Sequence, residues 1–428
     1  MDTVFALATA QGRAGVSVVR LSGPDAFTIA LSLIGSLPPV REAATRILRD
    51  ADGEILDRAL VLCFAAPRSF TGEDVVEFHL HGSVSIVQAM LSSLGKQDGA
   101  RLAEPGEFTR RALENGKLDL SQVEGLADLI DAETEAQRKQ ALRVFSGDFG
   151  ARVEGWRSRL IRCAALIEAT IDFADEEVPE DVSGEVLDLL SAVQDELTQE
   201  IAGTFVAERI RSGFEVAIVG PPNVGKSTLL NRLAGREAAI TSEIAGTTRD
   251  VIEVSMDLKG LPVTFLDTAG LRESADEIES IGITRGLDRA AAADLRVFLS
   301  RPDEKLLINP GPTDITLRPK SDLEEDVVGG ISGKTGYGVS TLVNRVHGIL
   351  QKRASGIGLA TRERHRVAMQ TASDILGQAR LVIKQGPASY DIAAEELRSA
   401  IRALETVVGR IDVESLLDEI FSSFCLGK

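Results

Sequence analysis

The chain of 428 residues has few cysteines, few aromatic side chains and no long apolar run. Its three cysteines, Cys63, Cys163 and Cys425, are far apart, so they provide neither a disulfide framework nor the spacing of a metal site. No apolar segment approaches the ~20 residues that span a bilayer, and the N-terminus carries an acid where a signal peptide carries bases. These absences favour a protein of the reducing cytoplasm.

The chain also lacks basic character, because its formal net charge at pH 7 is −18. An acidic molecule repels the phosphate backbone of nucleic acids, so the chain as a whole does not attract RNA. If it acts on RNA, it has to use a local basic patch or a more basic partner. Its length and its 44% hydrophobic content allow two to four domains with real cores.

One stretch, Gly220-Pro-Pro-Asn-Val-Gly-Lys-Ser-Thr228, carries a motif with a clear chemical meaning. It fits the pattern G-x-x-x-x-G-K-S, follows the strand-like run 214–219 and precedes the helix-like segment 228–233. Strand, glycine-rich loop and helix N-terminus in this order predict a phosphate-binding loop rather than a simple turn before a surface helix. Lys226 is expected to reach the β- and γ-phosphates, and Ser227 to supply an oxygen to Mg²⁺.

Two further segments follow in the order that a GTP-binding domain requires. Gly246-Thr-Thr-Arg-Asp250 offers Thr248 as a second hydroxyl for Mg²⁺, although alone it is equally typical of a threonine-rich turn. Val263-Thr-Phe-Leu-Asp-Thr-Ala-Gly270 is typical of a strand that ends in D-x-x-G. Asp267 is then expected to hold the metal through water, and the N–H of Gly270 to contact the γ-phosphate.

The predicted base-reading element is Pro319-Lys-Ser-Asp322, in which a proline replaces the carboxamide of the usual N-K-x-D. The carboxylate of Asp322 can accept the two N–H groups that guanine presents. Ile331-Ser-Gly-Lys334 follows where a loop over the base is expected. Taken alone, the tetrapeptide is also typical of a charged surface loop. Guanine is the predicted base.

Hydrolysis of the nucleotide needs a group that orients water, and the residue after D-x-x-G cannot do this. It is Leu271, where related GTPases carry a glutamine. The acidic segment Glu273-Ser-Ala-Asp-Glu-Ile-Glu279 lies just beyond and is the nearest source of a replacement.

Residues 1 to about 117 are expected to form a mixed α/β unit, because strand-like and helix-like runs alternate there. Strands are predicted at 15–21, 59–64 and 75–79, and helices at 24–33 and 83–94. His79 and His81 alternate at strand spacing without a third ligand nearby, so they are predicted to be ordinary strand residues rather than metal ligands.

From Leu118 the pattern becomes helical, with apolar residues every three or four positions. An acidic stretch at 172–181, expected to be a solvated loop, separates two helices. Neither helical segment, 118–212 or 352–428, looks able to fold on its own. We therefore expect the two to form one helical domain, with a nucleotide domain, 213–351, inserted between its halves. The apolar stripes are Val153, Trp156, Leu160, Cys163, Ile167 and Ile171; Leu397, Ile401, Leu404, Val408 and Ile411; and Leu416, Leu417, Ile420, Phe421 and Phe424.

Taken together and in this order, these stretches resemble the MnmE (TrmE) family of bacterial tRNA-modification GTPases over the whole chain. The resemblance implies an N-terminal mixed α/β domain for folate binding and dimerisation, a central helical domain, and a Ras-like P-loop GTPase domain of TrmE type inserted between the helical halves. Besides the nucleotide motifs, the matching stretches are Gly12-Arg-Ala-Gly-Val16 with Arg20, Ser69-Phe-Thr-Gly-Glu-Asp74, Pro105-Gly-Glu-Phe108, Lys117-Leu-Asp-Leu120, Ala127-Asp-Leu-Ile-Asp131, Ile171-Asp-Phe173 and Phe424-Cys-Leu-Gly-Lys428.

The resemblance implies a homodimer that binds a tetrahydrofolate derivative, 5-formyl- or 5,10-methylene-tetrahydrofolate, through Arg20, Glu77, Lys117 and Lys428. It also implies a heterotetramer with the FAD- and NADH-dependent protein MnmG (GidA). The pair would add an aminomethyl or carboxymethylaminomethyl group to C5 of the wobble uridine of certain tRNAs. Cys425 matches the functional terminal cysteine of the family, although a thiol near a chain end is more often part of an ordinary helix end.

The resemblance further implies that a potassium ion takes the place of an arginine finger. Asn223 matches the side chain that helps to hold the ion, with backbone groups near Ser242, Ile244 and Thr247, and Glu279 matches the carboxylate that positions water. The GTP-binding residues that follow from the motifs and the resemblance are Asn223, Val224, Gly225, Lys226, Ser227, Thr228, Ser242, Glu243, Ile244, Ala245, Gly246, Thr247, Thr248, Asp267, Thr268, Ala269, Gly270, Lys320, Asp322, Ser332, Gly333 and Lys334.

Two other functions fit part of the pattern. A ribosome-assembly GTPase that binds rRNA would share the nucleotide motifs, but it needs an attached basic RNA-binding domain, and this acidic chain has none. A nucleotide-gated scaffold would leave all the chemistry to its partner, and folate binding by residues 1–117 would count against it.

Overall fold

The computed structural model describes two compact units, Met1–Ala127 with Glu405–Lys428, and Asp128–Leu404. Among the described residues, no helix is long and apolar enough to cross a membrane. The domain limits predicted at 117, 212 and 351 stay a prediction. The described residues are 2–172, 182–236, 238–240, 253–267, 288–301, 304, 306, 308–323, 328–356, 358–411, 417, 420, 421, 424 and 427.

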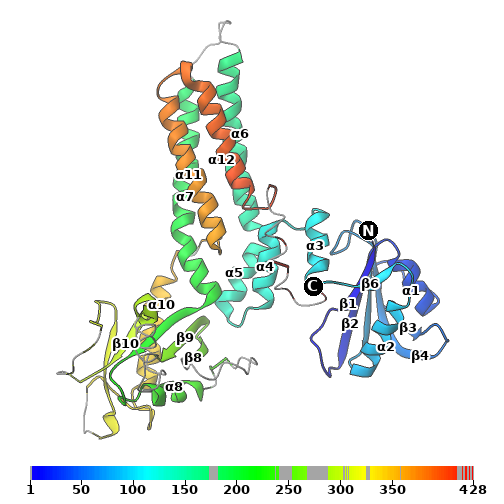
Figure 1. Cartoon of the computed structure of the whole chain (residues 1–428), viewed down its shortest axis with the longest axis horizontal. Coiled ribbons are helices and arrows are strands. Elements are labelled where there is room, and N and C mark those ends of the chain that lie inside the picture. Colours follow the sequence, from blue (N-terminus) through cyan, green and yellow to red (C-terminus); the bar gives the residue numbers. More distant parts are fainter. Residues whose placement is uncertain are drawn as a thin grey trace, which may run out of the picture. The chain divides into compact units, whose positions relative to one another are not determined.

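The first unit is built on a six-stranded sheet with the order β3-β4-β5-β2-β1-β6. β6 pairs in parallel with β1, and all other neighbours are antiparallel. Helices α1 (Ala26–Ile34) and α2 (Val84–Gly95) pack on one face through a shared apolar core (Figure 1). The strands are β1 (Thr3–Leu7), β2 (Val16–Ser22), β3 (Ala44–Arg49), β4 (Ile55–Phe64), β5 (Val75–His81) and β6 (Ala100–Leu102).

The elements predicted in this unit are confirmed as β2, β4, β5, α1 and α2. Alternation places Phe78 and Leu80 of β5 in the core, while Glu77 and His79 lie on the opposite face. The first helix begins at Ala26 rather than at residue 24, because a turn closed by the N–H of Ala26 and the carbonyl of Gly23 precedes it.

The end of the chain packs within this first unit. Phe421 and Phe424 form an apolar cluster with Val123 of α4 (Leu120–Ile130), next to α3 (Glu107–Glu114). Gly427, with φ 92°, lies so close to the carbonyl of Leu7 that a Cβ would not fit between them. The third predicted stripe is therefore used against α4, with Leu416 outside the described residues.

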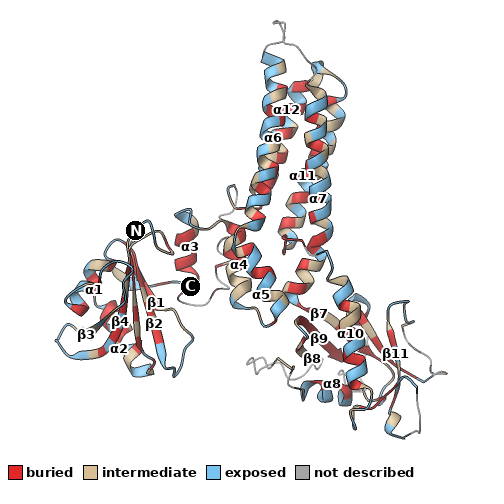
Figure 2. Ribbon diagram, turned by 180° about the vertical axis from the view of Figure 1, so that it is seen from behind, coloured by how far each residue is buried: buried red, intermediate tan, exposed pale blue. Residues whose placement is uncertain are grey.

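In the second unit, four long helices run alongside one another with their buried faces turned inward (Figures 1 and 2). They are α6 (Asp148–Asp172), α7 (Ser183–Ser212), α11 (Glu363–Ile383) and α12 (Tyr390–Glu405), and the shorter α5 (Glu135–Phe145) contacts α6 and α7. Trp156 of α6 is fully buried, and its Nε1 donates a hydrogen bond to Glu196 of α7 at 2.8 Å.

Two details of the predicted stripes are wrong. Ile171 is 40% exposed, because it lies in the last turn of α6, beyond the packed part of the helix. α12 ends at Glu405, so Val408 and Ile411 lie beyond the helix, in a stretch where Gly409 adopts φ 78°. The acidic stretch between α6 and α7 lies almost entirely outside the described residues.

The nucleotide domain contains a second six-stranded sheet with the order β12-β11-β10-β7-β9-β8. Only β8 runs antiparallel to its neighbour. Helices α8 (Lys226–Ala234) and α10 (Val339–Arg353) contribute to its main core. The strands are β7 (Phe214–Val219), β8 (Glu253–Leu258), β9 (Leu261–Asp267), β10 (Leu295–Leu299), β11 (Ile315–Pro319) and β12 (Gly330–Ile331).

The chain enters the nucleotide domain from α7 and leaves it through residues 354–362, and the two crossings are held together. The carboxylate of Glu200 on α7, 2% exposed, accepts hydrogen bonds from the backbone N–H groups of Leu359 and Ala360. A Cβ on Gly203 would lie 2.7 Å from the backbone nitrogen of Gly358, so the two backbones touch where no side chain fits. We name these five residues the crossing clamp.

The architecture confirms the predicted fold class. An α/β unit precedes a helical domain, and a P-loop domain is inserted between the two helical halves. Such an insertion requires its two ends to lie close together, and the crossing clamp provides this.

Gly203→Ala is expected to destabilise the chain by about 1–3 kcal/mol, because the new methyl group has to displace backbone rather than a flexible side chain. The midpoint of thermal unfolding, followed by helical circular dichroism, should fall. Gly155→Ala on α6 is the matched control, because nothing lies within 4 Å of its Cβ position. Its midpoint should stay the same or rise, because alanine favours the helix over glycine by up to ~1 kcal/mol of unfolding free energy. Equal midpoints for the two variants would contradict the clamp.

Candidate functional sites

The phosphate-binding loop follows the central strand of the nucleotide domain. β7 has β9 on one side and β10 on the other, and ligands of open α/β sheets bind at such a reversal of strand order. Asn223 and Gly225 both adopt the left-handed region, with φ of 59° and 112°. These residues curl the loop, and Gly225 caps the N-terminus of α8, which favours an anion at this point.

Lys226 is held beneath the loop with only 4% of its surface exposed. Its Nζ donates to the carbonyl oxygens of Gly220 at 2.7 Å and Pro221 at 2.9 Å. Burial lowers the pKa of Lys226, and the nearby carboxylate of Asp267 opposes this shift. An ammonium group in this position can stabilise phosphate oxygens strongly, because little water screens it.

Ser227 and Asp267 bring two oxygen ligands together at the ends of two elements. Ser227 is the second residue of α8, Asp267 is the last residue of β9, and Oγ donates to Oδ2 at 2.6 Å. Asp267 is fully buried. A hydroxyl and a carboxylate at this separation fit Mg²⁺, which prefers hard oxygen ligands and keeps several waters.

The loop predicted to cover the base lies against the phosphate-binding helix. A Cβ on Gly333 would lie 2.7 Å from the backbone nitrogen of Leu229 and 2.8 Å from the carbonyl carbon of Thr228. Only glycine permits this approach, which fixes Ser332 and Lys334 beside the start of α8. The structure thus brings the predicted phosphate and base segments together.

Asp322 follows β11 in a short 3-10 helix, Ser321–Leu323. A hydrogen bond from Ser332 lowers the pKa of Asp322, and Lys334 and Lys320 add to the shift. The carboxylate is therefore ionised, as recognition of two guanine N–H groups requires. Pro319 is the last residue of β11 and pairs with Ile331 in the sheet.

Several predicted residues lie outside the described part of the chain. Asn223, Val224 and Thr228 are in place around the loop, with Asn223 exposed. The residues outside are Ser242, Glu243, Ile244, Ala245, Gly246, Thr247, Thr248, Thr268, Ala269, Gly270 and Glu279, together with Cys425 and Lys428.

In the first unit, Arg20 and Glu77 are direct partners across β2 and β5. Their side chains form an ion pair, with Arg20 Nη2 and Nε at 2.8 and 3.0 Å from Oε1 of Glu77. The guanidinium lies 5.3 Å from the ring centre of Phe70 and 5.5 Å from that of Phe108. The group combines donors, an acceptor and aromatic faces, which suits a flat polar heterocycle.

Lys117 also approaches this region, because a Cβ on Gly72 would lie 3.0 Å from its Cε. Lys428 is not described, but its neighbour Gly427 lies against Leu7, one residue from Ala6, the partner of Arg20 on β1. Three of the four predicted folate contacts, Arg20, Glu77 and Lys117, thus belong to one face and one loop of the first unit.

Sequence reasoning assigned no role to Phe70, Phe108 or His79. The first two lie in the stretches Ser69–Asp74 and Pro105–Phe108, which carried the resemblance but no chemistry of their own. His79 lies two residues after Glu77 on the same strand face, with Nε2 3.5 Å from Oε2 of Glu77. Strand alternation was the available signal for this neighbour.

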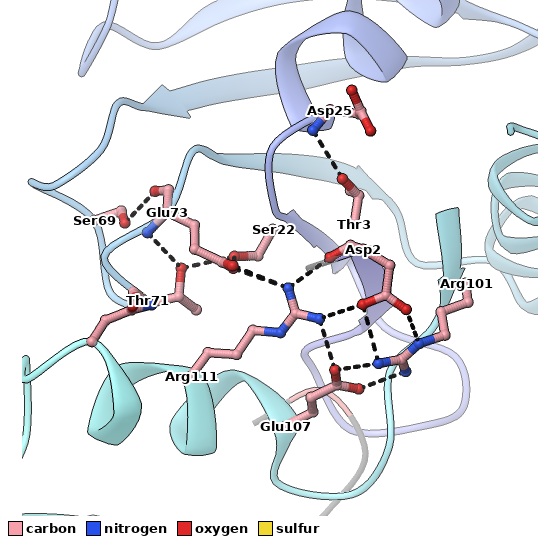
Figure 3. A network of polar contacts seen from close by, with 11 residues as sticks. Asp2, Thr3, Ser22, Asp25, Ser69, Thr71, Glu73, Arg101, Glu107 and Arg111 are labelled. Carbon is pink, nitrogen blue, oxygen red and sulfur yellow. Dashed lines mark hydrogen bonds and ion pairs between the residues drawn. The ribbon is translucent and has the colours of Figure 1, made fainter. Parts of the chain in front are cut away.

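A buried polar network fixes the loop that carries Phe70 (Figure 3). Arg111, with only 5% of its side chain exposed, pairs with Glu73 at 3.1 Å and Glu107 at 2.8 Å. Ser22 of β2 hydrogen-bonds Thr71 and Glu73, both at 2.7 Å. Burial acts to raise the pKa of Glu107, but hydrogen bonds from Arg101 and Arg111 outweigh it and lower the pKa. Glu107 is therefore held in its ionised form, and the contacts of Arg111 and Ser22 with Glu73 and Thr71 position the loop.

The two described thiols are unsuited to nucleophilic chemistry. Cys63 and Cys163 are both buried. Burial raises the pKa of Cys63 and raises that of Cys163 to about 11, so neither forms a thiolate near neutral pH.

Comparisons with known proteins agree with this arrangement over the whole chain. A family model described as the MnmE helical domain matches residues 120–425, and one described as the N-terminus of GTP-binding protein TrmE matches residues 3–117. The tRNA modification GTPases MnmE of Roseobacter denitrificans and Ruegeria pomeroyi are 68% and 64% identical over 428 residues, which cover 100% of each chain.

Among solved structures, Era in complex with MgGDPNP and nucleotides 1506–1542 of 16S ribosomal RNA matches 32% of this chain and 56% of its own length. The identity is 28% and the TM-score 0.24, which is too low to carry a structural argument. The full-length relatives and the two family models are decisive: the chain belongs to the MnmE family of tRNA modification GTPases.

Proposed function

We propose that this chain binds GTP in the loop 220–228, hydrolyses it with the help of Mg²⁺ and K⁺, and uses the cycle to modify tRNA. As a member of its family, the chain is a GTP hydrolase that acts in tRNA modification. The observation that carries the nucleotide chemistry is the contact between Ser227 Oγ and the buried Asp267 Oδ2, beside Lys226.

Each part of the nucleotide has a proposed group. Lys226 leaves its two carbonyl partners for the β- and γ-phosphates, and the backbone of residues 223–228 surrounds the same oxygens. Ser227 and Thr248 would hold Mg²⁺, with Asp267 acting through water. Asp322 and Lys320 would read guanine next to residues 332–334, and residues 242–247 and 268–270 are further proposed GTP-binding residues.

Hydrolysis relies on a cation rather than on a glutamine or an arginine finger. Leu271 stands where a water-orienting side chain is expected, so Glu279 is proposed to position the attacking water. Asn223 is exposed on the loop with a left-handed backbone. Its carbonyl oxygen, with backbone groups near Ser242, Ile244 and Thr247, is proposed to hold K⁺ beside the phosphates, where the charge stabilises the transition state.

The face around Arg20 is the proposed site for a tetrahydrofolate derivative. Arg20 donates and Glu77 accepts, which suits the mixed donor and acceptor edge of a pterin ring, while Phe70 and Phe108 offer aromatic surface. Lys117 and Lys428 are proposed to meet the negatively charged glutamate tail. When bound, the folate supplies a one-carbon unit.

The proposed product is a wobble uridine that carries an aminomethyl or carboxymethylaminomethyl group at C5. The chain would act as a homodimer in the cytoplasm, assembled with an FAD- and NADH-dependent MnmG-type partner. Cys425 is proposed as a functional thiol, since Gly427, two residues further on, lies against Leu7 of β1 in the sheet that carries Arg20. The rival role in ribosome assembly has no comparable support, because the relatives that match the full chain are tRNA modification GTPases.

Ser227→Ala should weaken Mg²⁺-dependent GTP binding by about tenfold or more, because it removes an oxygen that hydrogen-bonds Asp267 at 2.6 Å. Titration of a fluorescent GTP analogue with and without Mg²⁺ measures this. Ser255→Ala is the control, since its hydroxyl hydrogen-bonds Thr264 on β9 at 3.0 Å, away from Asp267. Unchanged Mg²⁺ dependence in Ser227→Ala would remove this residue from the metal site.

GTP turnover is expected to be slow in Na⁺ and faster in K⁺, because only the larger ion fits the proposed site. Asn223→Ala should lose the K⁺ response, whereas Glu279→Ala should lose turnover but keep K⁺-dependent association of two nucleotide domains. Turnover in each salt, with light scattering in the presence of a GDP–metal fluoride mimic, tests both. Equal rates in Na⁺ and K⁺ for the unaltered chain would reject the cation site.

Cells without this chain should have wobble uridines that lack the 5-substituent in the affected tRNAs. Mass spectrometry of hydrolysed tRNA measures this directly, and normal modification would reject the tRNA assignment.

Complementation with Cys425→Ser is expected to restore GTP hydrolysis but not modification. Cys163→Ser is the matched control, since burial keeps that thiol protonated. Full rescue by Cys425→Ser would make the terminal thiol structural only.

A further inference from the structure

A chain with a net charge of −18 that acts on tRNA needs a place where the charge is locally positive. Many arginines of the described residues do not provide one, because carboxylates neutralise them. Examples are Arg111 with Glu73 and Glu107, Arg159 with Glu196, and Arg289 with Glu215. A surface that binds RNA therefore requires several neighbouring arginines without acidic partners.

Such a place lies in the first unit, between the end of α1 and the edge strand β3. A cavity of about 730 Å³ opens there, and Arg46, Arg49 and Arg58 are the charged residues of its lining. The rest of the lining comes mainly from the last residues of α1 and from Thr45 and Ile47 of β3. We name this site the arginine hollow.

No described carboxylate forms an ion pair with any of the three arginines. Arg46 donates only to backbone carbonyls, those of Ser36 at 2.8 Å and Thr45 at 3.0 Å. Arg49 likewise donates to the carbonyl of Gly53 at 2.9 Å.

Two acidic side chains nearby in the sequence, Asp50 and Asp57, have other partners. Asp50 accepts the backbone N–H groups of Asp52 and Glu54 in the turn after β3. Asp57 accepts from the backbone and the ring of His81. These carboxylates do not line the hollow, so its positive charge is not cancelled from within.

The spacing of the arginines suits a chain of phosphates rather than a single anion. Arg46 and Arg49 are three residues apart on the edge strand β3, which places their Cα atoms ~10 Å apart and their side chains on opposite faces of that strand. Arg58 lies on β4, opposite Ile47 between them. One phosphate group cannot be shared fully across this length, whereas a strand of RNA presents successive phosphates along it.

We propose that the arginine hollow binds the phosphate backbone of the tRNA substrate; this rests on the proposed function in tRNA modification. Contacts of this kind position the RNA without reading its sequence. They account for RNA binding by an acidic chain, since one local group of guanidinium charges faces the polyanion while the remaining negative surface limits binding elsewhere.

A different role is open to the same residues. β3 is an edge strand, and charged side chains on an edge prevent pairing with other chains. If that were their whole role, replacing them would change aggregation but not affinity for tRNA. The two roles therefore differ in a measurable quantity.

The test is the triple variant R46Q/R49Q/R58Q in the full-length chain, alone and with its flavoprotein partner. Binding of labelled tRNA is measured by fluorescence anisotropy from low to physiological salt. Since each phosphate contact contributes a slope of about 0.9 in log Kobs against log salt, the slope should fall by about two to three and binding at low salt should weaken at least about tenfold. GTP turnover should stay unchanged.

The control is the triple variant R138Q/R398Q/R402Q, which has the same net charge but loses exposed, ion-paired arginines of the second unit. Equal slopes for the two variants would overturn the arginine hollow. The proposed function fails separately, if the unaltered chain with its partner neither binds nor modifies tRNA. Aggregation of R46Q/R49Q/R58Q with unaltered tRNA binding would assign the arginines to edge protection.

Discussion

The attachment of the nucleotide domain depends on one buried carboxylate. Glu200 is withdrawn from water in α7, so its charge has to be balanced, and two backbone N–H groups and Arg152 Nη1, at 2.5 Å, provide this. The same contact brings the returning chain to within touching distance of the departing helix at Gly203 and Gly358. A Ras-like domain can therefore be inserted into the sequence of a helical domain without disrupting the packing of its helices.

The parts that sequence predicted well are those in which local pattern and chemistry coincide. The phosphate-binding loop was recognised because strand, glycines, lysine and helix stand in one order, and β7 has the predicted limits. Three of the six strands of the first unit, β2, β4 and β5, were predicted from alternation, whereas β1, β3 and β6 were not. The second predicted apolar stripe ran past the end of α12 at Glu405, because hydrophobic periodicity carries no information on a residue such as Gly409 that adopts a left-handed backbone.

Contacts between distant segments could not be predicted from the pattern alone. The aromatic neighbours of Arg20 come from residues 70 and 108, and the clamp joins residues more than 150 positions apart. The composition could not predict the arginine hollow either, because the net charge of a chain does not show how charges are distributed over its surface. The resemblance supplied the family and its expected chemistry together, while the three-dimensional structure supplied the neighbours that surround each site.

The environment of Trp156 has a practical consequence for spectroscopy. It is the only tryptophan of the chain, it is fully buried, and its indole nitrogen is bound to Glu196 on the neighbouring helix. Intrinsic fluorescence excited at the red edge of absorption therefore reports on the α6–α7 contact alone. Its emission can therefore show, without an added label, whether nucleotide binding changes the packing of the helical bundle.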